Sequence, residues 1–253
     1  MIHVGISVER KQEITLFVPF YNEGKREGVN EYLDSLSKLN GVKLVLVNDG
    51  STDHTLEILN TFLSRNIDIV THLKNLGKGE ALRQAMLEFL SNNCAAIIGY
   101  LDCDGAFPLE TVSKILEISE EKLSTGQYQV CIASRVMLSG RKVKRLRHRH
   151  YISRIVLTLL GLKFVFMPYD SQSGFKLFNN SEQLQRVLEK PFRTRWLFDL
   201  EILDRLTKQW KENIIWEEPV QEWSDKPGSH LNIKSALTVI REVSLLLFTR
   251  VKS

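Results

Sequence analysis

Residues 42–53 read VKLVLVNDGSTD, an apolar run that passes directly into a polar turn containing a glycine. The same pattern occurs at residues 14–23, ITLFVPFYNE, and at residues 95–104, AAIIGYLDCD. Each apolar run has the length and residue types of a buried β-strand. Ligands of open α/β sheets bind beyond the carboxyl ends of the strands, so the polar stretches after these runs predict one shared binding edge.

The chain alternates strands and helices up to about residue 136 and then changes character. In the first part we expect strands at 14–20, 43–47, 67–73, 95–101 and 129–136, and helices at 23–39, 52–64, 79–90 and 108–121. In the second part we expect a basic loop at 138–150, helices at 151–162, 181–188 and 197–210, strands at 173–178 and 214–223, and an amphipathic helix at 233–253. The alternation predicts an α/β fold with a mostly parallel sheet flanked by helices. We expect one domain, residues 1–253, with functional halves at about 13–136 and 137–232.

Composition excludes some classes of site. The 253 residues are 43% apolar and 25% charged, which is ordinary for a globular protein with a large core. A net charge of +4 fits an anionic ligand or surface but selects neither. The three cysteines have no CxxC spacing, so we expect no disulfide framework or zinc site, and a reducing compartment.

We expect no segment of this sequence to cross a membrane. Residues 1–12 lack the apolar core of a secretory signal, and no apolar run reaches the roughly 18–20 residues of a span. The stretches Ile155–Met167 and Ala236–Val251 are apolar but interrupted by charges, which suits a membrane surface. The second stretch is equally well explained as a helix that packs on the core. We therefore expect a cytoplasmic protein associated peripherally with the membrane, either directly or through a partner. A membrane-protein partner and a homo-oligomer both stay open.

The turn Asp102-Cys103-Asp104 offers two carboxylates just after a strand. Mg²⁺ and Mn²⁺ prefer such oxygen ligands and usually share them with substrate phosphates. A solvated or capping turn explains the same spacing, since such triplets also occur by chance. The stretch Asn48–Asp53 is open to two interpretations as well, because one of its polar residues would cap a helix, although a cap does not account for the whole string.

Four motifs together resemble those of the family 2 glycosyltransferases. They are Val18-Pro19-Phe20-Tyr21-Asn22-Glu23, Val47-Asn48-Asp49-Gly50-Ser51-Thr52-Asp53, Asn75-Leu76-Gly77-Lys78-Gly79 and Asp102-Cys103-Asp104, in matching order and spacing. The resemblance implies a GT-A fold, which is Rossmann-like, a nucleotide-sugar donor and a divalent metal, Mg²⁺ or Mn²⁺. The absence of a Gly-x-Gly-x-x-Gly or Walker motif weighs against a dinucleotide enzyme or a P-loop nucleotidase.

The resemblance also implies roles for single residues. Asp104 is expected to be the main metal ligand, with Asp102 near the ribose and the metal. Glu23 and Asp49 would hold the base and ribose. Gly77 and Gly79 would let the backbone approach the nucleotide, and Lys78 would meet the diphosphate unless it is an exposed, solvated lysine. The expected donor-binding residues are Pro19, Tyr21, Glu23, Asp49, Gly77, Lys78 and Asp102.

Further motifs narrow the resemblance. Residues 170–178, DSQSGFKLF, resemble a segment of the polyprenyl-phosphate glycosyltransferases, which include dolichyl-phosphate mannose synthases and β-glucosyltransferases. We call Asp102-Cys103-Asp104 the metal turn. Three features are most similar to the glucosyltransferase branch: residues 198–201, FDLE, residues 223–229, WSDKPGS, and Ala106 after the metal turn. The resemblance therefore implies transfer of a hexose from UDP-glucose or a similar UDP-sugar to a polyprenyl phosphate.

The segment from Arg141 to Arg154 carries seven lysines and arginines and no acidic residue, and the apolar residues 155–167 follow at once. This arrangement suits an anionic headgroup on an apolar chain. A solvated basic loop is the plainer interpretation. Nucleic acid is not expected as a partner, because few aromatic residues are interleaved and the donor motifs would stay unexplained. The resemblance implies Arg135, Ser153 and Arg154 as residues on the phosphate side. With these, the expected acceptor-binding residues are Arg147, Arg149, Ser153 and Gln172, and the expected catalytic residues are Asp104, Asp170, Arg135 and Arg154.

The expected step is an inverting displacement at the anomeric carbon. A phosphate monoester has a second pKa of about 6 and needs no strong general base, so Asp170, Asp199 and Glu201 would position arginines or sugar hydroxyls. One alternative is a family 2 transferase that adds sugar to a glycan hydroxyl in cell-surface polysaccharide synthesis and uses Asp170 or Asp199 as a base. The other is a non-catalytic module that senses a nucleotide-sugar or anchors at a membrane, which the intact metal turn disfavours.

Overall fold

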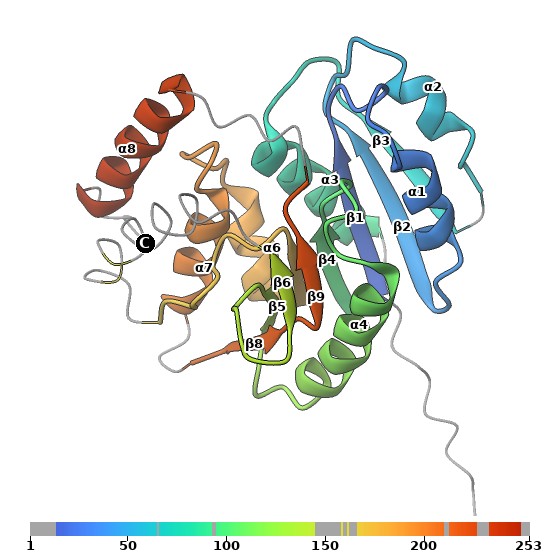
Figure 1. Ribbon diagram of the computed structural model, residues 1–253. Coiled ribbons are helices and arrows are strands. Elements are labelled where there is room, and N and C mark those ends of the chain that lie inside the picture. Colours follow the sequence, from blue (N-terminus) through green and yellow to red (C-terminus); the bar gives the residue numbers. More distant parts are fainter. Residues whose placement is uncertain are drawn as a thin grey trace, which may run out of the picture.

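The apolar runs form neighbouring parallel strands at the centre of the sheet (Figure 1). The computed structural model describes residues 14–64, 66–92, 95–144, 158, 161, 166–209, 213–226 and 233–248. Strand β1 (Ile14–Phe20) pairs in parallel with β2 (Val42–Asn48) on one side and β4 (Ile97–Leu101) on the other. All residues of β1 and β4 are buried, which explains why these strands are continuous apolar runs. The polar turns that follow the three strands lie at one edge of the sheet, as expected.

Over the described residues the main sheet has seven strands, in the order β3-β2-β1-β4-β7-β5-β8. Strand β7 is antiparallel to its neighbours β4 and β5, and the other pairs are parallel, which confirms the expected mostly parallel sheet. These further strands are β3 (Ile67–Thr71), β5 (Val130–Ser134), β7 (Phe175–Asn179) and β8 (Ile215–Pro219). A small second sheet pairs β6 (Lys142–Lys144) in parallel with β9 (Glu222–Ser224).

Helices cover both faces of the main sheet (Figure 1). They are α1 (Val29–Ser37), α2 (Thr55–Asn60), α3 (Lys78–Asn92), α4 (Leu109–Ser124), α6 (Glu182–Glu189), α7 (Phe198–Thr207) and α8 (Ile233–Phe248). Leu16 and Val18 of β1 belong to one apolar cluster with α1 and α4, whereas Phe17 belongs to a second cluster with α3, α6 and α7. Successive side chains of a strand point to opposite faces, so a fully apolar strand requires helices on both sides.

Several expected elements differ from the structure. The helix expected at 23–39 begins only at Val29, because the N–H groups of residues 22–24 donate to the loop after β2 and Gly28 has a φ of 80°. The helix expected at 52–64 is limited to Thr55–Asn60. The strand expected at 214–223 is divided between the two sheets, since β8 ends at Pro219, which has no N–H to donate.

The basic segment of the second half is structured in part. The expected loop at 138–150 contains strand β6, whose pairing with β9 links this segment to the WSDKPGS motif. Residues 145–150 lie outside the described part of the chain. The helix expected at 151–162 is also outside it, apart from residues 158 and 161, which are helical.

Helix α8 packs on the start of α7. Its residues Val243 and Leu246 form a buried cluster with Leu200. The carboxylate of Glu242 accepts hydrogen bonds of 2.8–3.0 Å from the backbone N–H groups of residues 195–197. The described part of the C-terminal stretch therefore packs on α7, and its contact with a membrane surface stays a prediction. Within the described ranges, no helix combines the length and the apolarity needed to cross a bilayer.

Candidate active site

The loops after β1 and β2 are joined by side-chain hydrogen bonds. Asn22 donates its backbone N–H to the Ser51 hydroxyl at 3.1 Å, and its side-chain oxygen accepts the Thr52 N–H at 2.8 Å. The Glu23 N–H donates to Thr55 Oγ1 at 2.8 Å. These bonds explain why the polar string after β2 is longer than a helix cap requires, because it also fixes the loop that carries Glu23.

Asp49 fixes the next loop, residues 75–77. Its buried carboxylate accepts hydrogen bonds from Asn75 Nδ2 at 2.9 Å and from the backbone N–H groups of the following two residues at 2.6 and 2.9 Å. Burial raises the pKa of Asp49, and the N–H donors oppose that shift. Gly50 has a φ of 64°, and a Cβ there would lie 2.3 Å from the backbone of Lys74. The two loops are therefore in direct contact.

Lys78 binds the first aspartate of the metal turn. Its Nζ lies 2.5 Å from Asp102 Oδ1, and 5.5 and 5.6 Å from the ring centroids of Tyr100 and Phe198. Burial lowers the pKa of Lys78, but the carboxylates of Asp102 and Asp199 raise it by more, so the net shift is upward. Lys78 is thus an ion-paired cation beside the Asp102-Cys103-Asp104 turn, with 33% of its side chain exposed, and its contact with the diphosphate stays a prediction.

The negative charge of Asp104 is not neutralised by an ion pair with any of the described residues. One of its oxygens accepts the Ala106 N–H at 3.0 Å, in a tight turn where Gly105 has a φ of 68°. Burial and the negative charge of Asp102 raise the pKa of Asp104. Two carboxylates in this arrangement favour a bound cation.

Gly174 leaves the space that the Asp102 carboxylate occupies. The Asp102 N–H donates to the Gly174 carbonyl at 2.9 Å, and a Cβ on Gly174 would lie 2.0 Å from Asp102 Oδ2. Any side chain at this position would displace the carboxylate. The DSQSGFKLF motif of the second half is thereby tied to the metal turn of the first.

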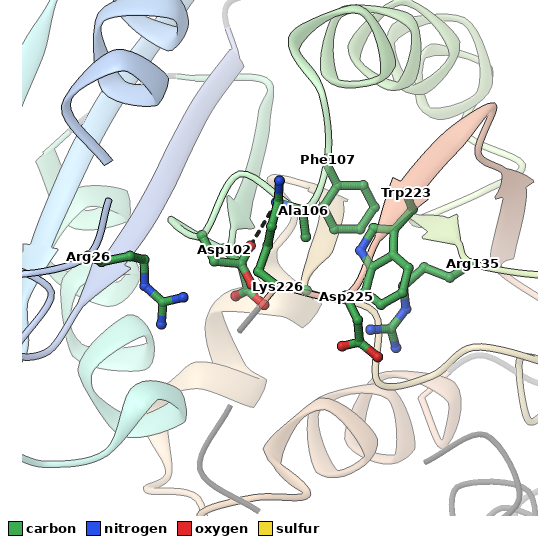
Figure 2. Close-up of a pocket in the computed structure, with 10 residues that line it drawn as sticks. Arg26, Asp102, Ala106, Phe107, Arg135, Trp223, Asp225 and Lys226 are labelled. Atoms are coloured by element: carbon green, nitrogen blue, oxygen red, sulfur yellow. Dashed lines mark hydrogen bonds between the residues drawn. The ribbon is translucent and has the colours of Figure 1, made fainter. Parts of the chain in front are cut away.

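Side chains from both halves line one small cavity (Figure 2). Its volume is about 170 Å³, and it is lined by Arg26, Asp102, Asp104, Ala106, Phe107, Arg135, Gly174, Trp223, Asp225 and Lys226. A larger cavity of about 790 Å³ shares Arg26, Asp104 and Lys226 with it and is also lined by Glu23. The Glu23 carboxylate forms an ion pair with Arg26, which holds this arginine at the boundary of the two cavities.

The two aspartates of the turn fit a divalent cation. Over the described residues, no group of three or more His, Cys, Asp or Glu side chains is arranged to hold a metal. Mg²⁺ is usually bound through one or two carboxylates together with substrate phosphates, so two are sufficient. Asp102 and Asp104 line the same cavity, and burial together with the charge of Asp102 raises the pKa of Asp104, so a bound cation would stabilise its charged form. These residues fit Mg²⁺ or Mn²⁺ completed by substrate oxygens.

Arg135 is held at the cavity by Asp170. The Asp170 carboxylate accepts hydrogen bonds from Arg135 Nε at 2.7 Å and from its Nη2 and backbone N–H at 2.8 Å. Glu217 accepts the Asp170 N–H at 2.8 Å, and the Trp223 ring centroid lies 5.1 Å from the guanidinium carbon. Burial lowers the pKa of Arg135, but Asp170 raises it by more. A fixed guanidinium of this kind suits a phosphate oxygen.

Asp199 and Glu201 are occupied inside the protein. Asp199 accepts hydrogen bonds from Lys176 Nζ at 2.5 Å and from the Tyr100 hydroxyl. Burial lowers the pKa of Lys176, and Asp199 opposes that shift. The fully buried Glu201 accepts hydrogen bonds from Arg193, Thr194 and Arg205. Both carboxylates are therefore engaged by cations and other donors of the protein.

Comparison with known proteins decides the family. The family model described as Glycosyl transferase family 2 matches residues 15–190. The chain belongs to glycosyltransferase family 2. A dolichyl-phosphate beta-glucosyltransferase of Trichomonas vaginalis is 30% identical over 94% of this transferase and 74% of its own length. The dolichyl-phosphate beta-glucosyltransferase of Homo sapiens is 30% identical over 87% of this transferase and 70% of its own length.

The fold of the transferase is also found in solved structures. Glucosyl-3-phosphoglycerate synthase from Mycobacterium tuberculosis, in complex with Mn²⁺, uridine diphosphate and glucosyl-3-phosphoglycerate, has a TM-score of 0.63 at 16% identity. The likeness covers 93% of this transferase and 78% of that chain. Together with the sheet order, it confirms the expected GT-A fold.

The transferase brings together expected residues from both halves. Asp102, Asp104 and Arg135 line the small cavity, and Glu23 lines the larger one. The Asp170 carboxylate and the Gln172 carbonyl accept hydrogen bonds from Arg135. The expected residues Arg147, Arg149, Ser153 and Arg154 lie outside the described part of the chain.

The remaining residues expected to bind the donor do not line these two cavities. Asp49, Gly77 and Lys78 border neither cavity. Pro19 is within β1, and Tyr21 just after it is 46% exposed. Their roles toward the donor stay predictions.

Gly77 and Gly79 of the transferase are required by the fold itself. A Cβ on Gly79 would lie 2.4 Å from the Phe198 ring, and Gly77 has a φ of 91°, in the left-handed region that favours glycine. The structure therefore explains both glycines without a nucleotide, whose backbone approach stays a prediction.

Sequence reasoning gave no site role to several charged or aromatic residues that line the cavity of the transferase, Phe107 among them. Trp223, Asp225 and Lys226 belong to the WSDKPGS motif, which was assigned to a branch of the family without a role. Arg26 follows the first motif by three residues and pairs with its Glu23. The signal was in each case a polar or aromatic residue inside or beside a motif already singled out.

Proposed function

We propose that this glycosyltransferase moves a hexose from UDP-glucose or a similar UDP-sugar to a polyprenyl phosphate, with inversion at the anomeric carbon. The observation that carries the proposal is the pair of Arg135 and Asp170 on the cavity of the metal turn. Arg135 supplies a fixed cation for an acceptor phosphate, and Asp170 is occupied in holding it. The relatives named as dolichyl-phosphate beta-glucosyltransferases support the same acceptor class.

The proposal explains why the carboxylates that could act as general bases are all held in ion pairs. Asp170, Asp199 and Glu201 each accept hydrogen bonds from a cationic side chain of the protein. A hydroxyl acceptor requires a carboxylate that can take up its proton. A phosphate monoester is already ionised near neutral pH and attacks the anomeric carbon without such help. One of its oxygens forms the new bond to the sugar as the bond from that carbon to the nucleoside diphosphate breaks.

The metal turn would act on the leaving group. Asp102 and Asp104 would hold Mg²⁺ or Mn²⁺, which neutralises negative charge on the departing diphosphate. Lys78 beside Asp102 and Arg26 at the cavity boundary add fixed positive charge nearby. The solved relative that contains Mn²⁺ and uridine diphosphate supports this use of the site.

Peripheral attachment to the membrane is part of the proposal. Met137, Leu138 and Tyr169 are large apolar or aromatic residues with 53%, 46% and 39% of their surface exposed. They lie just before and just after the segment that contains the expected acceptor residues Arg147, Arg149, Ser153 and Arg154. Apolar side chains beside a basic segment suit the surface of an anionic membrane. The cytoplasmic leaflet would present the lipid phosphate to Arg135.

The test is a panel of labelled UDP- and GDP-sugars, supplied with Mg²⁺ or Mn²⁺ and a short-chain polyprenyl phosphate in detergent. We expect metal-dependent labelled lipid from UDP-glucose, and no product from the Asp104→Ala variant. Hydrolysis of the donor without labelled lipid would contradict the acceptor and direct the search to hydroxyl acceptors. Labelled lipid from a GDP-sugar alone would contradict the proposed donor.

A further inference from the structure

The cavity contains a buried hydrogen-bond donor that the described part of the protein does not use. Trp223 is 4% exposed, and none of the described residues forms a hydrogen bond with its indole Nε1. Buried donors are nearly always paired, because an unpaired one has lost its bonds to water without replacement. Trp223 also lines the cavity that contains Asp102, Asp104 and Arg135. The missing partner is therefore to be sought in what the cavity binds.

The backbone around Trp223 fixes the ring in this position. Strand β9 pairs Trp223 with Val143 of β6, and the Ser224 N–H donates to the carbonyl of Ala106 at 3.3 Å. The ring itself lies against the Arg135 guanidinium, 5.1 Å from ring centroid to carbon. Because strand, metal turn and guanidinium all constrain the ring, its N–H cannot easily turn to another partner.

The ring is oriented so that its N–H and Arg135 serve different parts of the cavity. Figure 2 shows the indole nitrogen on the side of the ring toward Ala106 and Asp102, whereas Arg135 lies along another part of the ring. The cavity of about 170 Å³ is smaller than the 300–1,000 Å³ typical of drug-sized ligands, so it admits only part of a nucleotide-sugar. A sugar ring or a phosphate group has the oxygens that an indole N–H requires.

We infer that Trp223 is a substrate-binding residue, whose Nε1–H donates a hydrogen bond to an oxygen of the sugar or phosphate bound beside the metal turn. The inference rests on the proposed function, since it assigns a donor to the same reaction cavity. It gives Trp223 two contacts: the ring face packs on Arg135, and the ring edge binds substrate. The resemblance to the glucosyltransferase branch associated this residue with a motif but gave it no role.

The substitution Trp223→Phe tests the inference, because phenylalanine keeps an aromatic face for Arg135 and removes the N–H. We expect kcat/KM for transfer to fall about tenfold, the size of a hydrogen bond to a charged or polar substrate group. The thermal midpoint should fall only by what the smaller ring loses in packing, since no hydrogen bond within the described part of the protein is lost, and kcat/KM is therefore compared per folded molecule. Trp216→Phe is the matched control: Trp216 Nε1 already donates to Glu218 at 3.1 Å on β8, so activity should stay at the level of the parent. Parental kcat/KM in Trp223→Phe would overturn the inference.

A second measurement uses the unaltered protein and does not depend on the folding of that variant. Single Trp→Phe variants at 196, 210 and 216 assign three of the four indole N–H signals in a ¹⁵N spectrum, and the remaining signal belongs to Trp223. We expect the Trp223 signal to shift on addition of ligand in the presence of Mg²⁺. A shift with UDP-glucose but not UDP identifies a sugar hydroxyl, a shift with both identifies the diphosphate, and a shift with short-chain polyprenyl phosphate alone identifies the acceptor. A signal unmoved by all three, and by the donor that the parent enzyme turns over, overturns the inference.

The two measurements separate this inference from the proposed function. If the parent enzyme makes no labelled lipid but turns over a nucleotide-sugar, the acceptor proposal fails. The effect of Trp223→Phe is then measured on donor turnover, where a fall still supports the inference and parental turnover overturns it.

Discussion

Two pairs of acidic residues with the same spacing are used in opposite ways in this transferase. Asp102 and Asp104 follow β4, and Asp199 and Glu201 begin helix α7. At α7 each carboxylate is bound by a cationic side chain, Lys176 or Arg205, and by further donors. At the turn Lys78 binds Asp102, whereas the described residues form no ion pair with Asp104, whose pKa is raised by burial and by the charge of Asp102. The pair at α7 is fully engaged within the protein, and the pair at the turn keeps one carboxylate available to a ligand.

The strongest test of this comparison is Asp104→Ala. We expect transfer to fall by at least about 10³-fold, because the cation would lose a principal ligand and with it several kcal/mol of charge stabilisation. The thermal midpoint should change little or rise, since a repulsive charge is removed. Turnover with saturating Mg²⁺ and thermal unfolding are the measurements. Near-parental turnover would refute the metal assignment.

Glu201→Ala should give the opposite result. It leaves Arg205 and Arg193 without their buried partner, so we expect the free energy of unfolding to fall by about 3–5 kcal/mol. Donor turnover per folded molecule should stay close to the parent. Denaturant unfolding and active-site titration separate the two quantities. A stable but inactive variant would mean that Glu201 belongs to the catalytic machinery.

Gly174→Ala tests whether the metal turn depends on the space left by the second half. A Cβ there would lie 2.0 Å from Asp102 Oδ2, so the carboxylate must move. A displacement of about 1 Å near the chemistry can lower turnover about 10²-fold, and we expect a loss of that size. Gly126→Ala is the control: it has a φ of 74° but no neighbour within 4 Å, so it should affect stability alone. Equal turnover in both variants would contradict the proposed contact.

The smallest expected effect concerns the clamp formed by Glu242. Glu242→Ala leaves the N–H groups of residues 195–197 without their acceptor and loosens the loop that carries Arg195. We expect the donor KM to rise roughly threefold, comparable to one net hydrogen bond, with kcat unchanged. Steady-state kinetics with varied donor check this. A change in kcat without a change in KM would show that α8 acts on the chemical step instead.

Much of the donor half could be predicted because its signals are local. The apolar runs at 14–20 and 42–48 are strands with polar turns at their ends, and the DxD turn follows β4 as expected. The start of α1 could not be predicted, because the residues before Val29 bond to a loop some thirty positions later in the chain. The periodicity of apolar residues in a helix does not show that a distant loop will accept hydrogen bonds from the N–H groups of residues 22–24.

The environment of single polar residues was harder to predict. Lys176 stands within an apolar strand, and only the fold brings Asp199 to it from 23 residues away. Gly79 matched a donor motif, yet its immediate neighbour is the Phe198 ring. Trp223 was noted in a motif, but the unpaired state of its Nε1 is a property of the packed structure. In each case the deciding partner is distant in sequence.

A chain of hydrogen bonds connects Glu242 on α8 to the loops that follow β2 and β3. Glu242 holds the backbone of Arg195, whose side chain donates to Asn75, and Asn75 in turn donates to Asp49 at 2.9 Å. If docking of α8 orders this chain of contacts for the nucleotide-sugar, linkage requires the reverse as well. The substrate then tightens the docking of α8 by the same factor, and any surface that competes for the apolar face of α8 acts as an inhibitor of donor binding.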